Sequence, residues 1–155
     1  MRPGAAATPF PALGMALTLS DVPESHAAFP ELLDSFRNHM ATLLEHQDVD
    51  GLWHEVIDHR GSYAELSATA MIGTAMLRGI RSGWLDAGTY QASVDAAWRA
   101  VLVRAGSDGT LVDVCESTNK RPTLDAYLNR AAILGQDERG GGMVLFFATE
   151  MAPPQ

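Results

Sequence analysis

The chain has the length and composition of one globular domain. Hydrophobic residues make up 46% of its 155 positions and charged residues 19%, which excludes a disordered chain, and no apolar run is long enough to span a membrane. The net charge of -8 would repel phosphate backbones, so we expect no nucleic-acid partner. A single cysteine, Cys115, excludes an internal disulfide and a cysteine-based zinc site.

The first residues leave one targeting alternative open. Arg2 and the apolar stretch from Phe10 to Leu19 imitate a secretory signal. Pro9, Pro11 and Gly14 interrupt the compact apolar helix that a signal needs. We therefore expect a cytoplasmic protein that keeps this stretch as part of its fold.

Five predicted helical segments of two kinds follow one another along the chain. The stretches Pro9 to Leu19, Tyr63 to Ile80 and Gly142 to Met151 are apolar or small around most of their circumference, which is typical of helices covered on several sides. Between them lie two segments with one apolar face and one polar face, Phe29 to Leu44 and Tyr90 to Leu102. The order along the chain is thus inner, outer, inner, outer, inner.

An internal repeat accompanies this alternation. Asp50-Gly51 and Asp108-Gly109 each follow an outer segment and precede a short apolar run, and they are offset by 108 − 50 = 58 residues. Asp-Gly pairs form tight turns with positive φ, and we expect an extended stretch after each turn. A TPR or HEAT array has a shorter period and tighter links. The sequence therefore predicts an all-α chain with two concentric helical layers, part of an α/α toroid.

Several motifs resemble one family of glycoside hydrolases. They are Phe10-Pro11-Ala12-Leu13-Gly14-Met15-Ala16-Leu17, Asp50-Gly51-Leu52-Trp53-His54-Glu55-Val56, Ser62-Tyr63-Ala64-Glu65-Leu66-Ser67-Ala68-Thr69-Ala70, Arg78-Gly79-Ile80 to Gly83-Trp84-Leu85, and Gly135-Gln136-Asp137-Glu138-Arg139-Gly140-Gly141-Gly142. Their order and spacing resemble those of the unsaturated rhamnogalacturonyl and glucuronyl hydrolases, glycoside hydrolase families 105 and 88. The match extends from about Phe10 to the C-terminus.

The resemblance implies a six-hairpin (α/α)6 toroid, of which this chain matches roughly the last three helical hairpins. We expect residues 9–155 to be the C-terminal half of that domain and residues 1–8 to be a non-family segment. The family's catalytic Asp lies in the first half, so the resemblance implies no catalytic residue here and an inactive isolated chain. The expected reaction is hydration of the C4=C5 bond of a terminal unsaturated uronic acid in pectin-derived oligosaccharides. No metal or organic cofactor is implied.

Substrate-binding candidates lie where loops enter the inner helices. Trp53 either stacks on a sugar ring or packs beneath the Asp-Gly turn. His54 either hydrogen-bonds the substrate or is structural. Arg139, followed by three glycines, either places a cation and bare amides near an acidic sugar or permits a tight helix entry.

Three further candidates start the central inner segment. Ser62 and Glu65 have the spacing of a capping box, so Glu65 either lines the pocket or satisfies the helix backbone. Tyr63 and Ser67 are four residues apart, so we expect them on one face of the helix. That face either lines the pocket or packs between hairpins.

Half a toroid leaves apolar surface uncovered. We expect the terminal inner segments to expose Leu13, Leu17, Val144 and Phe147 and the chain to self-associate through them. The partners expected are therefore an unsaturated uronic-acid oligosaccharide and a second copy, with no membrane and no nucleic acid. The alternative to an enzyme is a catalytically dead helical interaction module or a truncated gene product.

Overall fold

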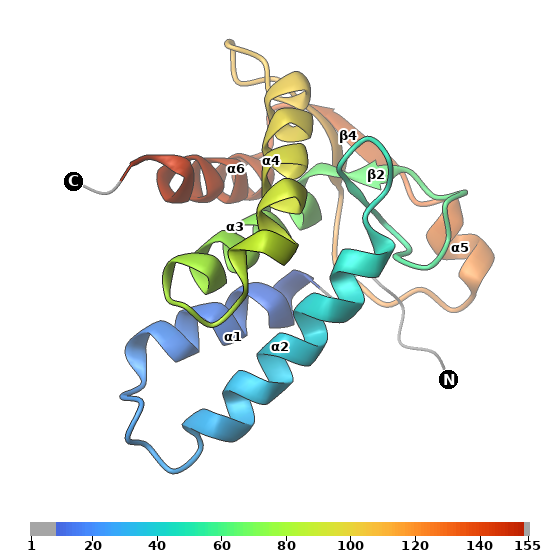
Figure 1. Ribbon diagram of the computed structural model, residues 1–155. Coiled ribbons are helices and arrows are strands. Elements are labelled where there is room, and N and C mark those ends of the chain that lie inside the picture. The colour runs from blue at the N-terminus through green and yellow to red at the C-terminus, as the bar shows by residue number, and fades with distance from the viewer. Residues whose placement is uncertain (1–8, 154–155) are drawn as a thin grey trace.

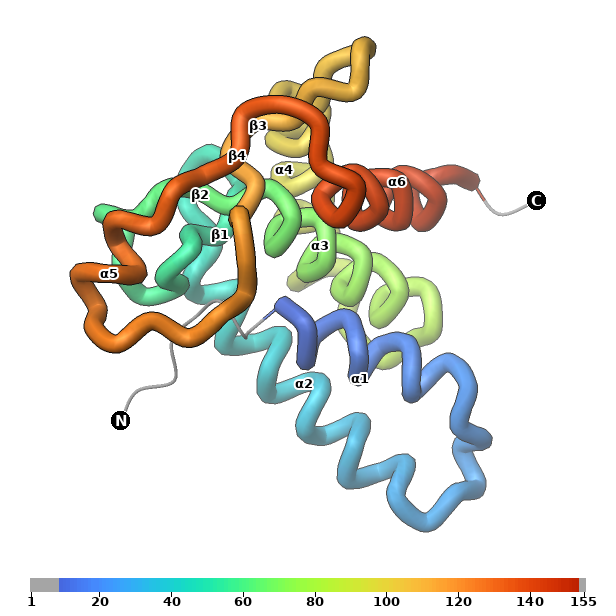
Figure 2. The backbone as a smooth tube through the Cα atoms, turned by 180° about the vertical axis from the view of Figure 1, so that it is seen from behind, coloured from blue at the N-terminus to red at the C-terminus, as the bar shows by residue number. Residues whose placement is uncertain are grey.

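A computed structural model describes residues 9–153, and its helices form two layers. The inner layer consists of α1 (Pro9–Asp21), α3 (Leu66–Arg81) and α6 (Glu138–Met151), and the outer layer of α2 (Phe29–His46) and α4 (Ala87–Arg104). Figure 1 shows α2 and α4 in front of the inner helices, and Figure 2 shows α1, α3 and α6 side by side from behind. The predicted alternation of inner and outer helices is confirmed.

The central helix α3 is buried on nearly all sides because small and apolar residues occupy most of its circumference. It contacts α1 on one side, α6 on the other and α4 behind. Phe147 of α6 lies directly on Gly73, where an added Cβ would come within 2.4 Å of the phenyl ring. The small residues of α3 thus let its neighbours approach closely, as the sequence predicted.

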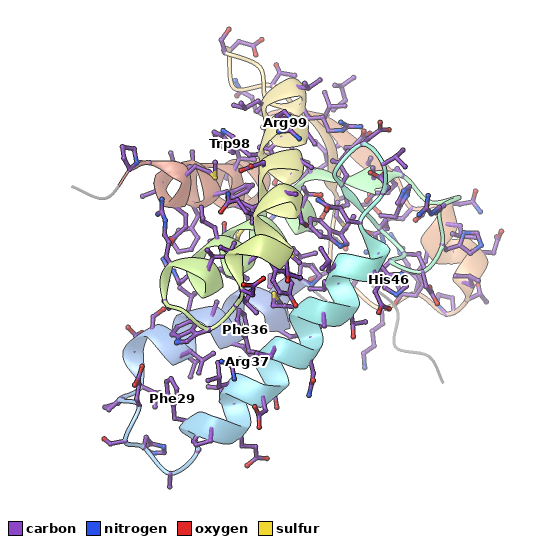
Figure 3. The ribbon with its side chains drawn as sticks, viewed as in Figure 1. Phe29, Phe36, Arg37, His46, Trp98 and Arg99 are labelled. Carbon is purple, nitrogen blue, oxygen red and sulfur yellow. The ribbon has the colours of Figure 1, made fainter. Side chains whose placement is uncertain are left out.

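The outer helices attach to the inner layer through aromatic side chains. Phe36 of α2 packs edge-to-face on Trp84, with ring centroids 6.0 Å apart, and Trp98 of α4 packs edge-to-face on Phe147 at 5.3 Å. Figure 3 labels Phe36 and Trp98 on these two helices. Their polar faces point away from the inner layer, in line with the predicted one-sided pattern.

Two small sheets correct the expectation of an all-α chain. The first is antiparallel and pairs β1 (Trp53–His54) with β2 (Ala64–Glu65), and the second pairs β3 (Leu111–Cys115) with β4 (Ala132–Gly135). A short helix, α5 (Leu124–Leu128), precedes β4. The extended runs expected after the Asp-Gly turns exist as β1 and β3. Their partner strands, β2 and β4, were not predicted.

The two Asp-Gly turns repeat each other in detail. In the first, Asp48 N donates to Leu52 O and Gly51 N to Asp48 O, and in the second, 58 residues later, the same bonds join the corresponding positions. Gly51 has φ +87° and Gly109 φ +84°. The internal repeat and its positive-φ glycines are therefore confirmed.

These turns differ in what surrounds them, which makes a matched test. A Cβ at Gly51 would lie 2.6 Å from the backbone of Ala96, whereas one at Gly109 would meet only Gln136 Nε2 at 3.9 Å. Gly109→Ala is expected to cost about 1–2 kcal/mol for its left-handed backbone. Gly51→Ala is expected to lower the free energy of unfolding by about 1–3 kcal/mol more, because the backbone of Ala96 must move away from the added methyl group. Urea unfolding of both variants checks this difference, and equal losses would contradict it.

The two helices at the edges of the inner layer, α1 and α6, expose apolar surface. Phe10 of α1 is 48% exposed and Leu145 of α6 is 68% exposed, while Leu13, Leu17 and Val144 are half-buried. The expectation for Phe147 was wrong, because its side chain is fully buried between Gly73 and Trp98. Among residues 9–153, no helix combines the length and apolar character needed to cross a membrane.

Candidate functional site

One pocket lies at the end of the inner layer where α1, α3 and α6 begin. Its walls come from the first residues of these three helices, from β1, from the end of β3 and from the loop after it. In Figure 2 the strands lie at the same end as the beginnings of the inner helices. Helix N-termini carry a partial positive charge, so their convergence favours an anionic group. Within the chain, Glu65 and Asp137 already supply such groups to α3 and α6.

Glu65 is the N-cap residue of α3 and is buried at the bottom of this pocket. One carboxylate oxygen accepts hydrogen bonds from Ser67 N at 2.9 Å, Ser67 Oγ at 2.7 Å and Cys115 N at 3.0 Å, and the other accepts from Ala68 N. Burial raises the pKa of Glu65 above its ordinary value, and the donated hydrogen bonds oppose this rise. Glu65 therefore joins α3 to β3 and satisfies the helix backbone.

The capping-box prediction was wrong in its details. The helix begins three residues later than Ser62 would require, and Ser62 instead bonds to Val56 N and His59 O. Tyr63 precedes the helix, so it does not share a helical face with Ser67. Ser67 lines the pocket, whereas Tyr63 does not, and its hydroxyl is buried without a hydrogen-bond partner among the described residues.

Trp53 and His54 of β1 line the pocket, but their ring nitrogens are bound to other groups of the chain. The Trp53 side chain is fully buried, and its Nε1 donates to Leu43 O at 2.7 Å. His54 Nδ1 lies 2.6 Å from Ser62 O, and Nε2 lies 3.1 Å from Asp48 Oδ2. Trp53 therefore packs beneath the Asp-Gly turn and does not offer a ring face on which a sugar could stack. Both ring nitrogens of His54 already face oxygen atoms of the chain.

Arg139 is the most accessible cation of the pocket. Its side chain is 63% exposed, and Nη2 donates to Glu116 O at 2.9 Å and to Asp137 Oδ2 at 3.1 Å. Asp137 caps α6 by accepting from Gly140 N, which lowers the pKa of this carboxyl. A Cβ at Gly141 or Gly142 would meet no atom within 4 Å, so the side of α6 that these two glycines form is open.

A buried ion pair that the sequence did not predict supports the pocket. Arg130 Nη1 lies 2.8 Å from Glu55 Oε1, with both side chains almost fully buried. The same guanidinium donates to Ser117 O and to Asn119 O, each at 2.6 Å. Burial raises the pKa of Glu55, and Arg130 opposes this rise. The pair thus fixes the loop after β3 against β1, and Ser117 and Glu55 both line the pocket.

A pH series tests the environment of Glu65. Because its pKa is raised in the folded state, the stability associated with its proton is present below about pH 4.5 and is lost as the pH rises through the folded pKa. Glu65→Gln removes this titration and also replaces one accepting oxygen by an amide NH2, so at least one accepted hydrogen bond is lost. We expect the variant to be less stable at every pH and its deficit to shrink as pH rises above 4.5. A deficit that grows with pH in urea unfolding would contradict the direction of the shift.

Comparison with known protein families identifies the family of this chain. The model of glycosyl hydrolase family 88 matches residues 10–154. The chain belongs to this family. Among curated relatives, the unsaturated rhamnogalacturonyl hydrolase YesR of Bacillus subtilis is 32% identical over 116 residues, which cover 75% of this chain and 32% of the relative. The unsaturated 3S-rhamnoglycuronyl hydrolase of Formosa agariphila is 34% identical over 104 residues, covering 62% and 26%.

Solved structures agree with the family assignment. A possible member of the GH105 family from Salmonella enterica superposes with a TM-score of 0.86 at 26% identity, and the match covers 95% of this chain and 39% of that one. A possible GH105 member from Klebsiella pneumoniae gives 0.84 at 27% identity, covering 95% and 38%. The match therefore spans between a quarter and a third of these curated relatives, and the chain corresponds to the C-terminal part of the family 88 fold.

Proposed function

We propose that this chain forms the part of an unsaturated uronyl hydrolase that holds the acidic terminal sugar of a pectin-derived oligosaccharide. The observation that carries the proposal is the convergence of three helix N-termini on one pocket that also contains Arg139. A carboxylate bound there can accept from the Arg139 guanidinium, and the positive ends of the helix dipoles favour its negative charge. The names of the curated relatives, which act on unsaturated rhamnogalacturonyl and rhamnoglycuronyl substrates, give the substrate class.

In the proposed reaction, a carboxylic acid protonates the C4=C5 bond and water adds to it, after which the product opens and the glycosidic bond breaks. The described carboxyl groups of the pocket are poorly placed for this proton transfer. Glu65 accepts four hydrogen bonds, Glu55 is paired with Arg130, and Asp137 accepts from Gly140 N and from Arg139. We therefore propose that this chain binds and orients the sugar, while the proton donor comes from outside the described residues.

The division of the sequence into residues 1–8 and a family domain from residue 9 stays a prediction, because residues 1–8 lie outside the described part. Within that part, no three His, Cys, Asp or Glu side chains are grouped closely enough to hold a metal ion. The proposed steps need only acid, water and groups that hold the sugar.

Binding of unsaturated digalacturonic acid tests the proposal. Isothermal titration of the purified chain should give measurable binding that weakens about tenfold or more in Arg139→Met, because a charge-assisted hydrogen bond to the carboxylate is lost. Arg99→Met, on the outer helix α4, is the matched control and should bind like the parent chain. The absence of binding, or equal weakening in both variants, would refute the assignment of the pocket.

The catalytic half of the proposal has its own assay. The unsaturated disaccharide absorbs in the near ultraviolet, and hydration removes this absorbance. We expect the isolated chain to leave the signal unchanged over hours while still binding the sugar. Rapid loss of absorbance that a substitution at Glu55 or Glu65 abolishes would place the proton donor within this chain instead.

A further inference from the structure

His54 lies between two hydrogen-bond acceptors in the wall of the pocket. Its Nδ1 is 2.6 Å from Ser62 O, and its Nε2 is 3.1 Å from Asp48 Oδ2. The side chains of His54 and Asp48 are 12% and 11% exposed, so water has little room to replace the contact between them. The ring thus joins the turn before β1 to the residue two positions before β2.

Neither acceptor has a hydrogen to offer the ring. Ser62 O is a backbone carbonyl, and the other oxygen of Asp48 accepts from Asp50 N at 2.9 Å and from Leu52 N at 3.0 Å, as expected of an ionised carboxylate. A neutral imidazole carries one N–H, so its other nitrogen would place a lone pair against an oxygen lone pair. Only the doubly protonated ring donates to both oxygens.

We propose that His54 is held as an imidazolium and is a charged positioning residue of the pocket. Its two N–H groups fix the β1–β2 hairpin, in which Ser62 comes three residues before Glu65, the N-cap of α3. Its charge also balances Asp48, and loss of the ring proton would leave that carboxylate to repel an anionic sugar. The effect on sugar binding rests on the function proposed above, whereas the protonation state rests on the hydrogen bonds alone.

Other charged and titratable groups surround the ring. The neighbouring elements contribute Glu55 of β1, Asp58, His59 and Arg60 of the loop to β2, Glu65 at the start of α3, Cys115 of β3, and Asp137 and Arg139 at the start of α6. Asp48 is the carboxylate that lies within ion-pair distance of the ring. A pH effect can therefore be assigned to His54 by replacing Asp48, because this substitution keeps all the other groups in place.

Asp48→Asn is a matched variant for the protonation state. Asparagine keeps one oxygen for Asp50 N and Leu52 N and turns its NH2 group toward Nε2, so it satisfies a neutral ring in the same geometry. In ¹⁵N–¹H correlation spectra at pH 7, assigned with His54→Gln, we expect hydrogens on both ring nitrogens in the parent chain and on Nδ1 alone in Asp48→Asn. Asp108→Asn, in the second Asp-Gly turn, is the control and should leave the His54 signals unchanged.

A single ring hydrogen on His54 in the parent chain at pH 7 would overturn the proposal. Two ring hydrogens in Asp48→Asn would overturn the assignment of the charge to the Asp48 contact. Both results are obtained without sugar, so they do not depend on the proposed function.

Sugar binding at two pH values tests the positioning role. Titration with unsaturated digalacturonic acid should show the affinity of the parent chain falling about fivefold or more from pH 6 to pH 9, because the uncharged ring no longer balances Asp48. Asp48→Asn should bind with nearly equal affinity at both pH values. Equal pH dependence in the two proteins would overturn the positioning role. A parent chain that binds no sugar at either pH would instead refute the proposed function, and the spectra would still decide the state of His54.

Discussion

Arg130→Met is expected to lower the free energy of unfolding by about 3–5 kcal/mol. The substitution leaves the buried Glu55 carboxylate without its cation, and it also removes the two 2.6 Å hydrogen bonds that hold the carbonyls of Ser117 and Asn119. Urea unfolding at neutral pH measures the loss. The double variant Glu55→Met/Arg130→Met should recover most of it, because no buried charge remains unpaired.

A surface ion pair of similar length is the matched control. Arg121 Nη2 lies 2.6 Å from Glu116 Oε1, but both side chains are about one-third exposed. Water already solvates this pair, so Arg121→Met should cost no more than about 1 kcal/mol. Equal losses for Arg130→Met and Arg121→Met would mean that burial of the Glu55–Arg130 pair does not determine its contribution.

Phe147→Ala is expected to cost about 3–5 kcal/mol. Its ring is fully buried between Gly73 of α3 and Trp98 of α4, so truncation leaves a cavity where three helices meet. Thermal and urea unfolding should both show the loss, with the cooperative transition kept.

The neighbouring phenylalanine supplies the comparison. Phe146 is 36% exposed, and the guanidinium of Arg78 lies 5.5 Å from its ring centroid. Phe146→Ala should cost about 1 kcal/mol, since little buried area and one weak cation–π contact are lost. If Phe146→Ala were as costly as Phe147→Ala, the orientation of α6 described above would be wrong.

The helices could be predicted from sequence because their patterns are long and repeated. The inner segments and the 58-residue repeat gave the two-layer arrangement, and the Asp-Gly pairs gave the positive-φ turns. The partner strands β2 and β4 escaped prediction, because a two-residue strand such as Ala64–Glu65 is too short for an alternating pattern. The side of α6 that faces α3 was also unpredictable, because an apolar helix gives periodicity no polar face to exclude.

The part of the pocket near the helix starts and the first turn was predicted. Ser67, Glu65 and Arg139 line it as expected, and so do Trp53 and His54 of β1, because the Asp-Gly turn delivers them to the start of α3. Glu55 and Arg130 are 75 residues apart and meet through the pairing of β3 with β4. A charged residue in an irregular segment gives no sign in the sequence that it will be buried.

The most direct test of the account is a chemical-shift map of the isotope-labelled chain titrated with unsaturated digalacturonic acid. We expect saturable shifts at the amides where the inner helices begin, centred on Ser67, Ala68, Arg139 and Gly140, with small shifts elsewhere. Shifts confined to the groove between α2 and α4 that contains Arg37 and Tyr90, or no saturable shifts at all, would contradict it.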